Sequence, residues 1–169
     1  MKIDSSISRQ YNYLEFELNR GVEMKDRNET SLKAFIALKR TNDAIDIAIR
    51  KDIRKYGLSV TEFAVLEVLY TKGPLTIQTI RDRILIASSS TTYVIERLIE
   101  KGYVLKEQDT KDRRTYYAGI TDEGRKVMED IFPMHAAMIQ SFFDCLEEDE
   151  LETLKEALKK VSARVSNII

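Results

Sequence analysis

Apolar residues recur at helical spacing in the first half of the chain, after a less regular start. Residues 1–28 mix polar and aromatic positions without a good helix cap, and we interpret them as an N-terminal extension. From about Ser31 to Lys55 the apolar positions fall every three or four residues, and Thr30 is available as a cap. The pattern predicts one long amphipathic helix within residues 29–56, ended by Gly57.

Shorter helices with strong boundary signals follow. Residues 59–62 (Ser-Val-Thr-Glu) have the pattern of a capping box, and the helix that they open stops at Gly73-Pro74. Thr76 can cap a short third helix. A run of hydroxyl residues at 88–92 introduces a fourth helix, which Gly102 closes. Two short helices joined by a tight connection, the later one beginning in small hydroxyl residues, are typical of a helix-turn-helix.

Two segments rich in β-forming residues come next. Residues 103–108 and 115–120 alternate in character, and they flank the charged sequence Asp-Thr-Lys-Asp-Arg-Arg at 109–114. This arrangement predicts a β-hairpin with a charged tip. The expected fold class is therefore mainly α with a small β-hairpin wing, a winged helix-turn-helix that occupies residues 57–121.

The chain ends in two more predicted helices. One runs from about Asp122 to Asp144, interrupted by Pro133, and the other runs from about Glu147 to Ser166. Amphipathic helices at both ends of a small module leave a surplus of apolar surface for a chain of 169 residues. We therefore expect residues 29–56 and 122–169 to supply N- and C-terminal dimerisation helices, and the protein to be a homodimer.

Composition and charge restrict the choice of partners. A chain of 169 residues with 43% hydrophobic and 33% charged residues fits one soluble domain. Its net charge of −1 gives no overall attraction for a polyanion, so nucleic-acid binding would depend on local clusters of Lys and Arg. The single cysteine and the lack of a signal-peptide pattern or of a membrane-length apolar run indicate a cytoplasmic protein with no membrane partner.

Two motifs around the predicted wing resemble those of a known family. Asp109-Thr110-Lys111-Asp112-Arg113-Arg114 is followed by Ile120-Thr121-Asp122-Glu123-Gly124, and members of the MarR family show Asp-x-x-Asp-Arg-Arg and then Leu-Thr-x-x-Gly. This chain departs only in having Ile120 for Leu. The resemblance covers about residues 30–168. Within the family, the stretch from Leu58 to Thr121, together with Asp130-Ile131-Phe132-Pro133, looks most like the branch that responds to quinones and related electrophiles.

The resemblance implies a function. It indicates a sequence-specific DNA-binding transcription regulator, a repressor released from a pseudo-palindromic operator by a small aromatic or phenolic ligand or by an electrophile. No cofactor, metal or catalytic residue is expected. The chain has no phosphate loop, nucleophile elbow, dinucleotide fingerprint or zinc spacing, which argues against an enzyme. A winged-helix module that binds protein instead of DNA remains an alternative.

The start of the fourth helix is the first candidate for DNA contact. Short hydroxyl side chains and free backbone N–H groups suit phosphates and base edges in the major groove, and this predicts contacts from Ser88, Ser89, Ser90, Thr91 and Thr92. The alternative is that these residues merely cap the helix. Tyr93 and Arg97 follow one turn later, and they can either contact DNA or face the protein.

The wing and the third helix supply further candidates. Arg113 and Arg114 lie at the predicted hairpin tip, where a guanidinium can enter the minor groove while Asp112 holds its neighbour in position; the family points chiefly to Arg114. The alternative is an ordinary solvated turn. Thr76 and Gln78 are expected to reach backbone phosphates.

Effector sensing is less visible in the sequence. The family implies a pocket between the dimerisation helices and the winged module, which Phe35, Tyr56 and Phe63 could line, although their helical spacing is also typical of ordinary core residues. Cys145 allows a thiol-based redox regulator as an alternative, but its apolar neighbours favour burial as a small core residue. His135, the single histidine, is expected on a helix surface and not in a metal site.

Overall fold

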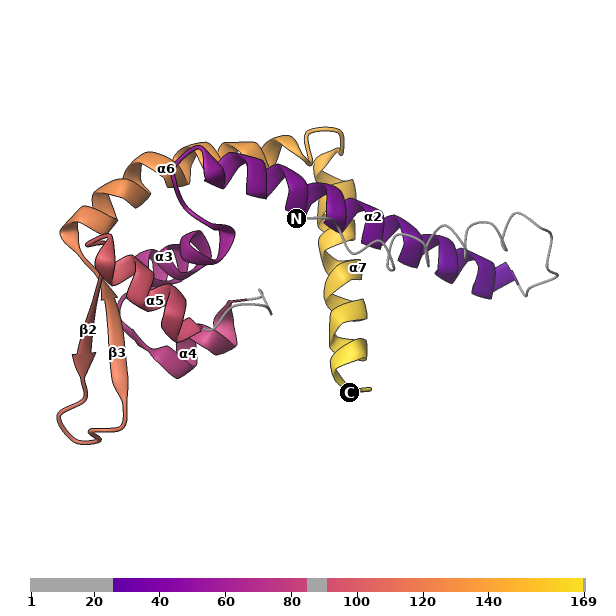
Figure 1. The fold of residues 1–169 in the computed structure, drawn as a ribbon. Coiled ribbons are helices and arrows are strands. Elements are labelled where there is room, and N and C mark those ends of the chain that lie inside the picture. The colour runs from indigo at the N-terminus through magenta and orange to yellow at the C-terminus, as the bar shows by residue number, and fades with distance from the viewer. Residues whose placement is uncertain (1–25, 85–90, 169) are drawn as a thin grey trace. The chain divides into compact units, whose positions relative to one another are not determined.

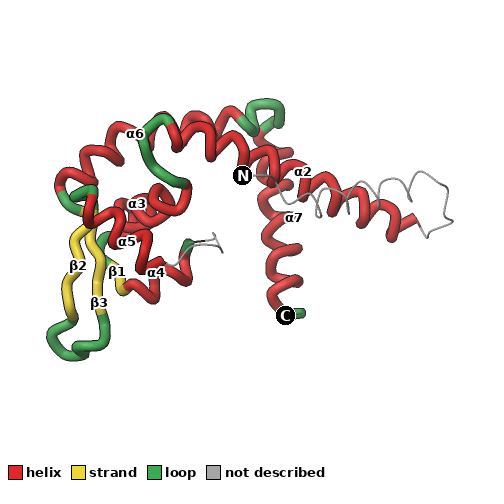
Figure 2. Tube along the Cα trace, in the orientation of Figure 1, coloured by secondary structure: helices red, strands yellow, loops and turns green. Residues whose placement is uncertain are grey.

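The protein is described here by a computed structural model that covers residues 26–84 and 91–168. Its internal contacts divide the chain after Gly57 into two compact units, each of which is described separately. The first unit contains helix α2 (Asp26–Arg54). The second contains all the other described elements (Figures 1 and 2): α3 (Val60–Lys72), β1 (Leu75–Thr76), α4 (Ile77–Arg83), α5 (Thr91–Glu100), β2 (Val104–Gln108), β3 (Tyr116–Ile120), α6 (Asp122–Ser141) and α7 (Glu148–Ser166).

Helix α2 begins earlier than its sequence pattern predicts. Thr30 lies inside the helix and is not its cap, which corrects that expectation. Two local interactions support the additional turn: Lys33 Nζ lies 2.6 Å from Glu29 Oε1, and the Ser31 hydroxyl donates to the Arg27 carbonyl at 2.8 Å. Ile36 and Ile53 are buried, whereas Phe35, Leu38 and Ile47 remain exposed.

The start of α3 and the start of α4 both confirm the predicted caps. Ser59 Oγ accepts from the Glu62 backbone N–H at 3.1 Å, and Glu62 Oε2 accepts from the Ser59 N–H at 2.7 Å. Thr76 Oγ1 accepts from the Thr79 N–H at 3.1 Å. Each cap satisfies backbone donors that have no partner within the helix, and so fixes where the helix begins.

A three-stranded antiparallel sheet carries the wing. Its order is β1-β3-β2, with Leu75 opposite Ala118 and Val104 opposite Ile120. The predicted hairpin is therefore confirmed as β2 and β3. The sequence pattern missed β1, because a strand of two residues is too short to show alternation.

The core of the second unit lies where α3, α4, α5 and α6 meet. Its fully buried side chains include Leu66 and Leu69 of α3, Ile80 of α4, Leu98 of α5 and Met128 of α6. Burying large aliphatic side chains stabilises a fold by about 1.5–3 kcal/mol each. The hydrophobic stripes of these helices thus determine which face of α5 is left for solvent.

The terminal helices differ in part from expectation. Helix α6 runs without interruption through Pro133 and ends at Ser141, before the predicted Asp144. The carbonyl left unpaired by Pro133 belongs to Glu129, and because both residues are exposed, water can satisfy it. Helix α7 begins in a capping box in which the Glu150 side chain accepts from the Glu147 N–H at 3.0 Å. This accounts for the acidic run at 147–150 in structural terms.

No helix in the described parts of the chain combines the length and the apolar character that crossing a membrane requires.

Candidate nucleic-acid interface

Helix α4 uses part of its polar surface internally. The Thr76 and Thr79 hydroxyl groups lie 2.7 Å apart and share a hydrogen bond, so the Thr76 side chain serves the helix cap. Gln78 is exposed, and its amide nitrogen donates to Asp82 Oδ1 and Oδ2 at 3.1 and 3.2 Å. Arg81 and Arg83 are also exposed, with Arg81 Nε 3.6 Å from Asp82 Oδ1. The cationic groups of α4 thus lie at its C-terminal end.

Helix α5 divides sharply into two faces. Thr91, Val94, Ile95 and Leu98 face the core, and Thr91 is only 6% exposed. The expectation that Thr91 presents its hydroxyl to DNA is therefore wrong, because this position belongs to the helix's buried stripe. Ser88, Ser89 and Ser90 lie outside the described residues.

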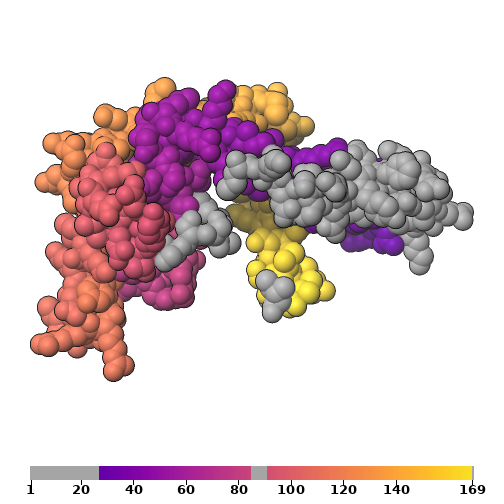
Figure 3. Space-filling view, viewed as in Figure 1, coloured from indigo at the N-terminus to yellow at the C-terminus, as the bar shows by residue number. Residues whose placement is uncertain are grey.

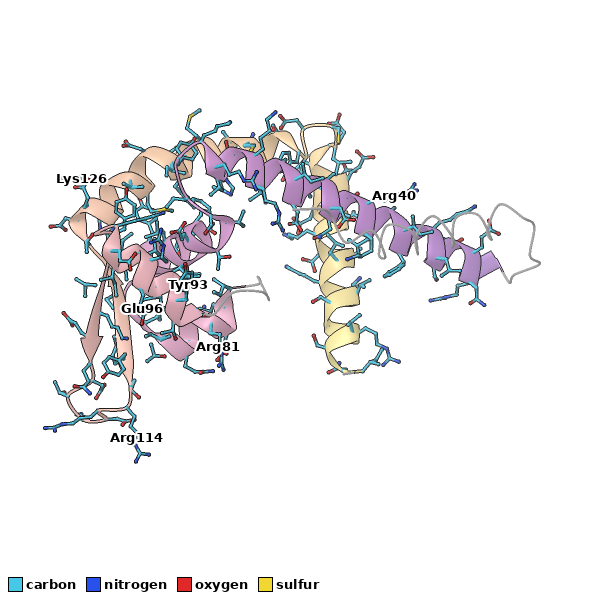
Figure 4. The ribbon with its side chains drawn as sticks, in the orientation of Figure 1. Arg40, Arg81, Tyr93, Glu96, Arg114 and Lys126 are labelled. Carbon is cyan, nitrogen blue, oxygen red and sulfur yellow. The ribbon has the colours of Figure 1, made fainter. Side chains whose placement is uncertain are left out.

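The opposite face of α5 is open to solvent. It carries Thr92, Tyr93, Glu96 and Arg97, with Tyr93 61% exposed. Arg97 Nη1 donates to Glu100 Oε2 at 2.7 Å, so its charge is paired along the helix. Figure 4 shows Tyr93 and Glu96 on α5 and Arg81 on the neighbouring α4. Glu96 was not among the residues predicted from the sequence, although its spacing from Tyr93 places both on one face of the helix.

The turn between β2 and β3 is organised by two aspartates. Asp109 Oδ1 accepts from the N–H groups of Lys111 and Asp112 at 2.6 and 2.8 Å. These hydrogen bonds, with a smaller contribution from Tyr117, hold the pKa of Asp109 below its ordinary value. Asp112 Oδ1 accepts from the Arg114 N–H at 3.0 Å, and its Oδ2 accepts from the Thr115 hydroxyl at 3.0 Å. Asp112 therefore positions the backbone of Arg114.

Arg113 and Arg114 are exposed at this turn. The wing extends away from the helices in the space-filling view (Figure 3), and Arg114 lies at its end (Figure 4). Gln108 Nε2 donates to the Arg113 carbonyl at 2.6 Å, which ties the turn to β2. Within residues 26–84 and 91–168, no carboxylate forms a salt bridge with either guanidinium. Two cations on a hydrogen-bonded, projecting turn form a surface that can approach a groove of a nucleic acid.

The residues proposed for sensing fall in different environments. Phe35 and Tyr56 are 45% and 36% exposed in the first unit, so neither is an ordinary core residue of the single chain. Phe63 is buried in the second unit, where its ring centroid lies 4.6 Å from that of His135. His135 is therefore buried against α3, which corrects its expected place on a helix surface.

Cys145 is exposed in the turn between α6 and α7. The interpretation of Cys145 as a buried core residue is wrong, because the flanking Phe142 and Phe143 are themselves only half-buried. Its thiol lies 3.9 Å from the Phe142 carbonyl oxygen.

Comparisons with known proteins agree with this architecture. Residues 58–116 match the model of the MarR family. Over 133 residues the chain is 46% identical to the HTH-type transcriptional regulator MhqR of Bacillus subtilis, covering 79% of this chain and 92% of that protein. Among solved structures, it resembles BpsR of Bordetella bronchiseptica, with a TM-score of 0.67 and 26% identity over 77% of this chain and 98% of BpsR.

A more distant structure supports the fold. The MarR family regulator AbsC of Streptomyces coelicolor superposes with a TM-score of 0.74 at 22% identity, covering 85% of this chain and 97% of AbsC. The predicted fold class, mainly α with a small β wing, is thereby confirmed.

Proposed function

The chain belongs to the MarR family of DNA-binding transcriptional regulators and is not an enzyme, and from this premise we propose that it is a homodimeric repressor released from its operator by a small aromatic or electrophilic effector. The observation that carries the proposal is the pairing, in one unit, of an open α5 face with a hydrogen-bonded wing turn that presents Arg113 and Arg114.

The docking mode follows from the two surfaces. Helix α5 enters the major groove with Thr92, Tyr93 and Arg97. Ser88, Ser89 and Ser90, which precede α5 in the sequence, supply further hydroxyl groups for contact with the DNA. Arg114 enters the adjacent minor groove, whose negative potential attracts a guanidinium. Gln78 and the cap at Thr76 place α4 against the phosphate backbone, which positions the protein without reading bases.

The dimer determines the form of the operator. Two copies of α5 related by a twofold axis would enter major grooves on the same side of the duplex, about 34–36 Å apart. The operator is then a pseudo-palindrome with half-sites one helical turn apart. In the acidic C-terminal region, residues 122–169 carry 11 acidic and 6 basic groups, and this region would lie away from the phosphates.

An apolar stripe along α7 supports dimerisation. Leu154, Leu158, Val161 and Val165 recur every three or four residues, and all are exposed in the single chain. No residue of α7 is buried within its own chain. A second copy supplies the apolar surface that this stripe lacks.

Release by an effector requires that the effector bind one conformation of the dimer more tightly than the other. BpsR, whose DNA binding is regulated by 6-hydroxynicotinic acid, provides the precedent for a small aromatic effector. Phe35 and Tyr56, both exposed in the first unit, supply aromatic surface for such a molecule. A second candidate mechanism is thiol-based, since exposed Cys145 is accessible to electrophiles and oxidants.

The test is selection of DNA from a random library followed by release. A pseudo-palindrome with half-sites one turn apart is expected, and phenols, quinones and aromatic acids are then screened for dissociation of the complex. Cys145→Ser distinguishes the mechanisms, because it abolishes release only in the thiol-based one. Recovery of no preferred sequence would refute the proposed function.

A further inference from the structure

The solvent face of α5 has an unusual charge for a helix that enters DNA. It carries two carboxylates, Glu96 and Glu100, and one guanidinium, Arg97. Arg97 is the single cation of α5, and it is bonded to Glu100 at 2.7 Å. Net attraction to phosphates must therefore come from other elements, such as the wing and the end of α4.

Glu96 occupies the middle of this face. Val94, Ile95 and Leu98 are buried on the other side of the helix, so the Glu96 side chain projects away from the core, one turn after Tyr93 (Figure 4). Among the described residues, no hydrogen-bond donor or cation pairs with its carboxylate. The acid thus remains available to whatever lies against α5.

A free carboxylate opposes binding to DNA unless the DNA supplies a donor. Phosphates repel it, and so do the exposed acceptors of guanine and thymine in the major groove. Amino groups are the donors that base edges offer there, on cytosine N4 and adenine N6. Adenine also presents the N7 acceptor beside its amino group, which repels the second carboxylate oxygen. Cytosine presents its amino donor alone and therefore fits best.

We propose that Glu96 reads a cytosine in each operator half-site by accepting a hydrogen bond from its N4 amino group. This inference rests on the proposed docking of α5 in the major groove. Where no cytosine amino group faces Glu96, its carboxylate is repelled by the phosphates and base acceptors of the DNA. Glu96 is therefore a specificity-determining residue, because it lowers the affinity for non-specific DNA more than it lowers the affinity for the operator.

The test compares three full-length proteins on the operator selected by the wild type. Glu96→Gln replaces the carboxylate with an amide that both donates and accepts, so it tolerates several bases. Glu107→Gln is the matched control, because it removes one exposed negative charge from β2 and leaves α5 unchanged. Circular dichroism and thermal unfolding establish that all three proteins are folded.

Each operator position is then changed in both half-sites, and affinities are measured by fluorescence anisotropy. For the wild type and Glu107→Gln, we expect one cytosine whose replacement by thymine weakens binding roughly tenfold to a hundredfold. For Glu96→Gln, that preference should fall to roughly threefold or less, and binding to scrambled DNA should become tighter.

Two results would overturn the proposal. In the first, Glu96→Gln keeps the wild-type base preference at every operator position, or the preference that it loses is one for adenine and not one for cytosine. Glu96 would then not read cytosine, although the regulator would still bind its operator specifically. If the wild type itself selected no sequence, the proposed function would fail together with this inference.

Discussion

The Glu62 carboxylate lies 2.8 Å from the ammonium group of Lys101, and this ion pair joins the first turn of α3 to the residue that follows α5. The same carboxylate also accepts from the Ser59 N–H at 2.7 Å. Burial alone would raise the pKa of Glu62, but Lys101 and the hydrogen bonds from Ser59 outweigh it and hold the pKa below its ordinary value. One side chain thus caps α3 and anchors the end of α5.

This pair predicts an acid-dependent contribution to stability. Because the folded pKa of Glu62 is lowered, the contribution is complete above the ordinary glutamate pKa of about 4.3 and is lost as the pH falls through the folded value. Glu62→Gln should lower the free energy of unfolding by roughly 1–3 kcal/mol at pH 7. Urea unfolding between pH 7 and pH 3 measures this, and a deficit that stayed constant down to pH 3 would contradict the account.

Gly124 shows why the motif after β3 ends in glycine. A Cβ at this position would lie 2.2 Å from the Tyr103 carbonyl oxygen, and that oxygen accepts from the Thr121 N–H at 3.0 Å. Gly124→Ala must move backbone and should destabilise the fold by roughly 2 kcal/mol or more. Gly119→Ala is the control, because its Cβ would meet Leu105 Cδ1 at an ordinary 3.5 Å. Equal melting temperatures for the two variants would be inconsistent with this explanation.

Arg114 should contribute to DNA affinity through its charge at the wing tip. Arg114→Ala is expected to weaken operator binding roughly tenfold or more, because a guanidinium lost from the minor groove is not replaced. The oligomeric state should not change. Lys126→Ala removes one positive charge from the exposed surface of α6, away from the wing, and should leave the affinity almost unchanged. Similar losses for both variants in anisotropy titrations would mean that only overall charge matters.

The α7 stripe predicts how the dimer can be broken. Leu158→Asp places a charge among Leu154, Val161 and Val165, and should shift the protein toward monomers because an unpaired carboxylate resists burial. Thr153→Asp adds the same charge outside the stripe and should leave the dimer intact. Sedimentation equilibrium distinguishes the two. A dimer equally stable in both variants would place the interface elsewhere.

Local signals in the sequence were sufficient for most element boundaries. Ser59 with Glu62, and Thr76 with Thr79, lie within a few residues of one another, so their capping bonds follow from spacing alone. The hairpin was predictable for the same reason, since its strands are adjacent along the chain. The prediction that Thr30 caps the first long helix was wrong, because several hydrophilic residues before Thr30 extend that helix equally well.

Positions that depend on tertiary packing were not predictable in this way. His135 is buried because α6 brings it against Phe63 of α3, a contact between residues far apart in sequence. Thr91 shares its chemistry with the neighbouring Thr92, and only the orientation of α5 against the core separates the buried hydroxyl from the exposed one. Cys145 has apolar neighbours, but a turn between two helices leaves it at the surface.

The central claim is specific DNA binding, and fluorescence anisotropy against the chain's own upstream promoter DNA and a scrambled control tests it most directly. The account predicts tight binding to the promoter that weakens steeply across a series of increasing salt concentrations, with much weaker binding to the scrambled DNA. Equal affinity for the two DNAs at every salt concentration, together with no preferred sequence recovered from a random library, would contradict it.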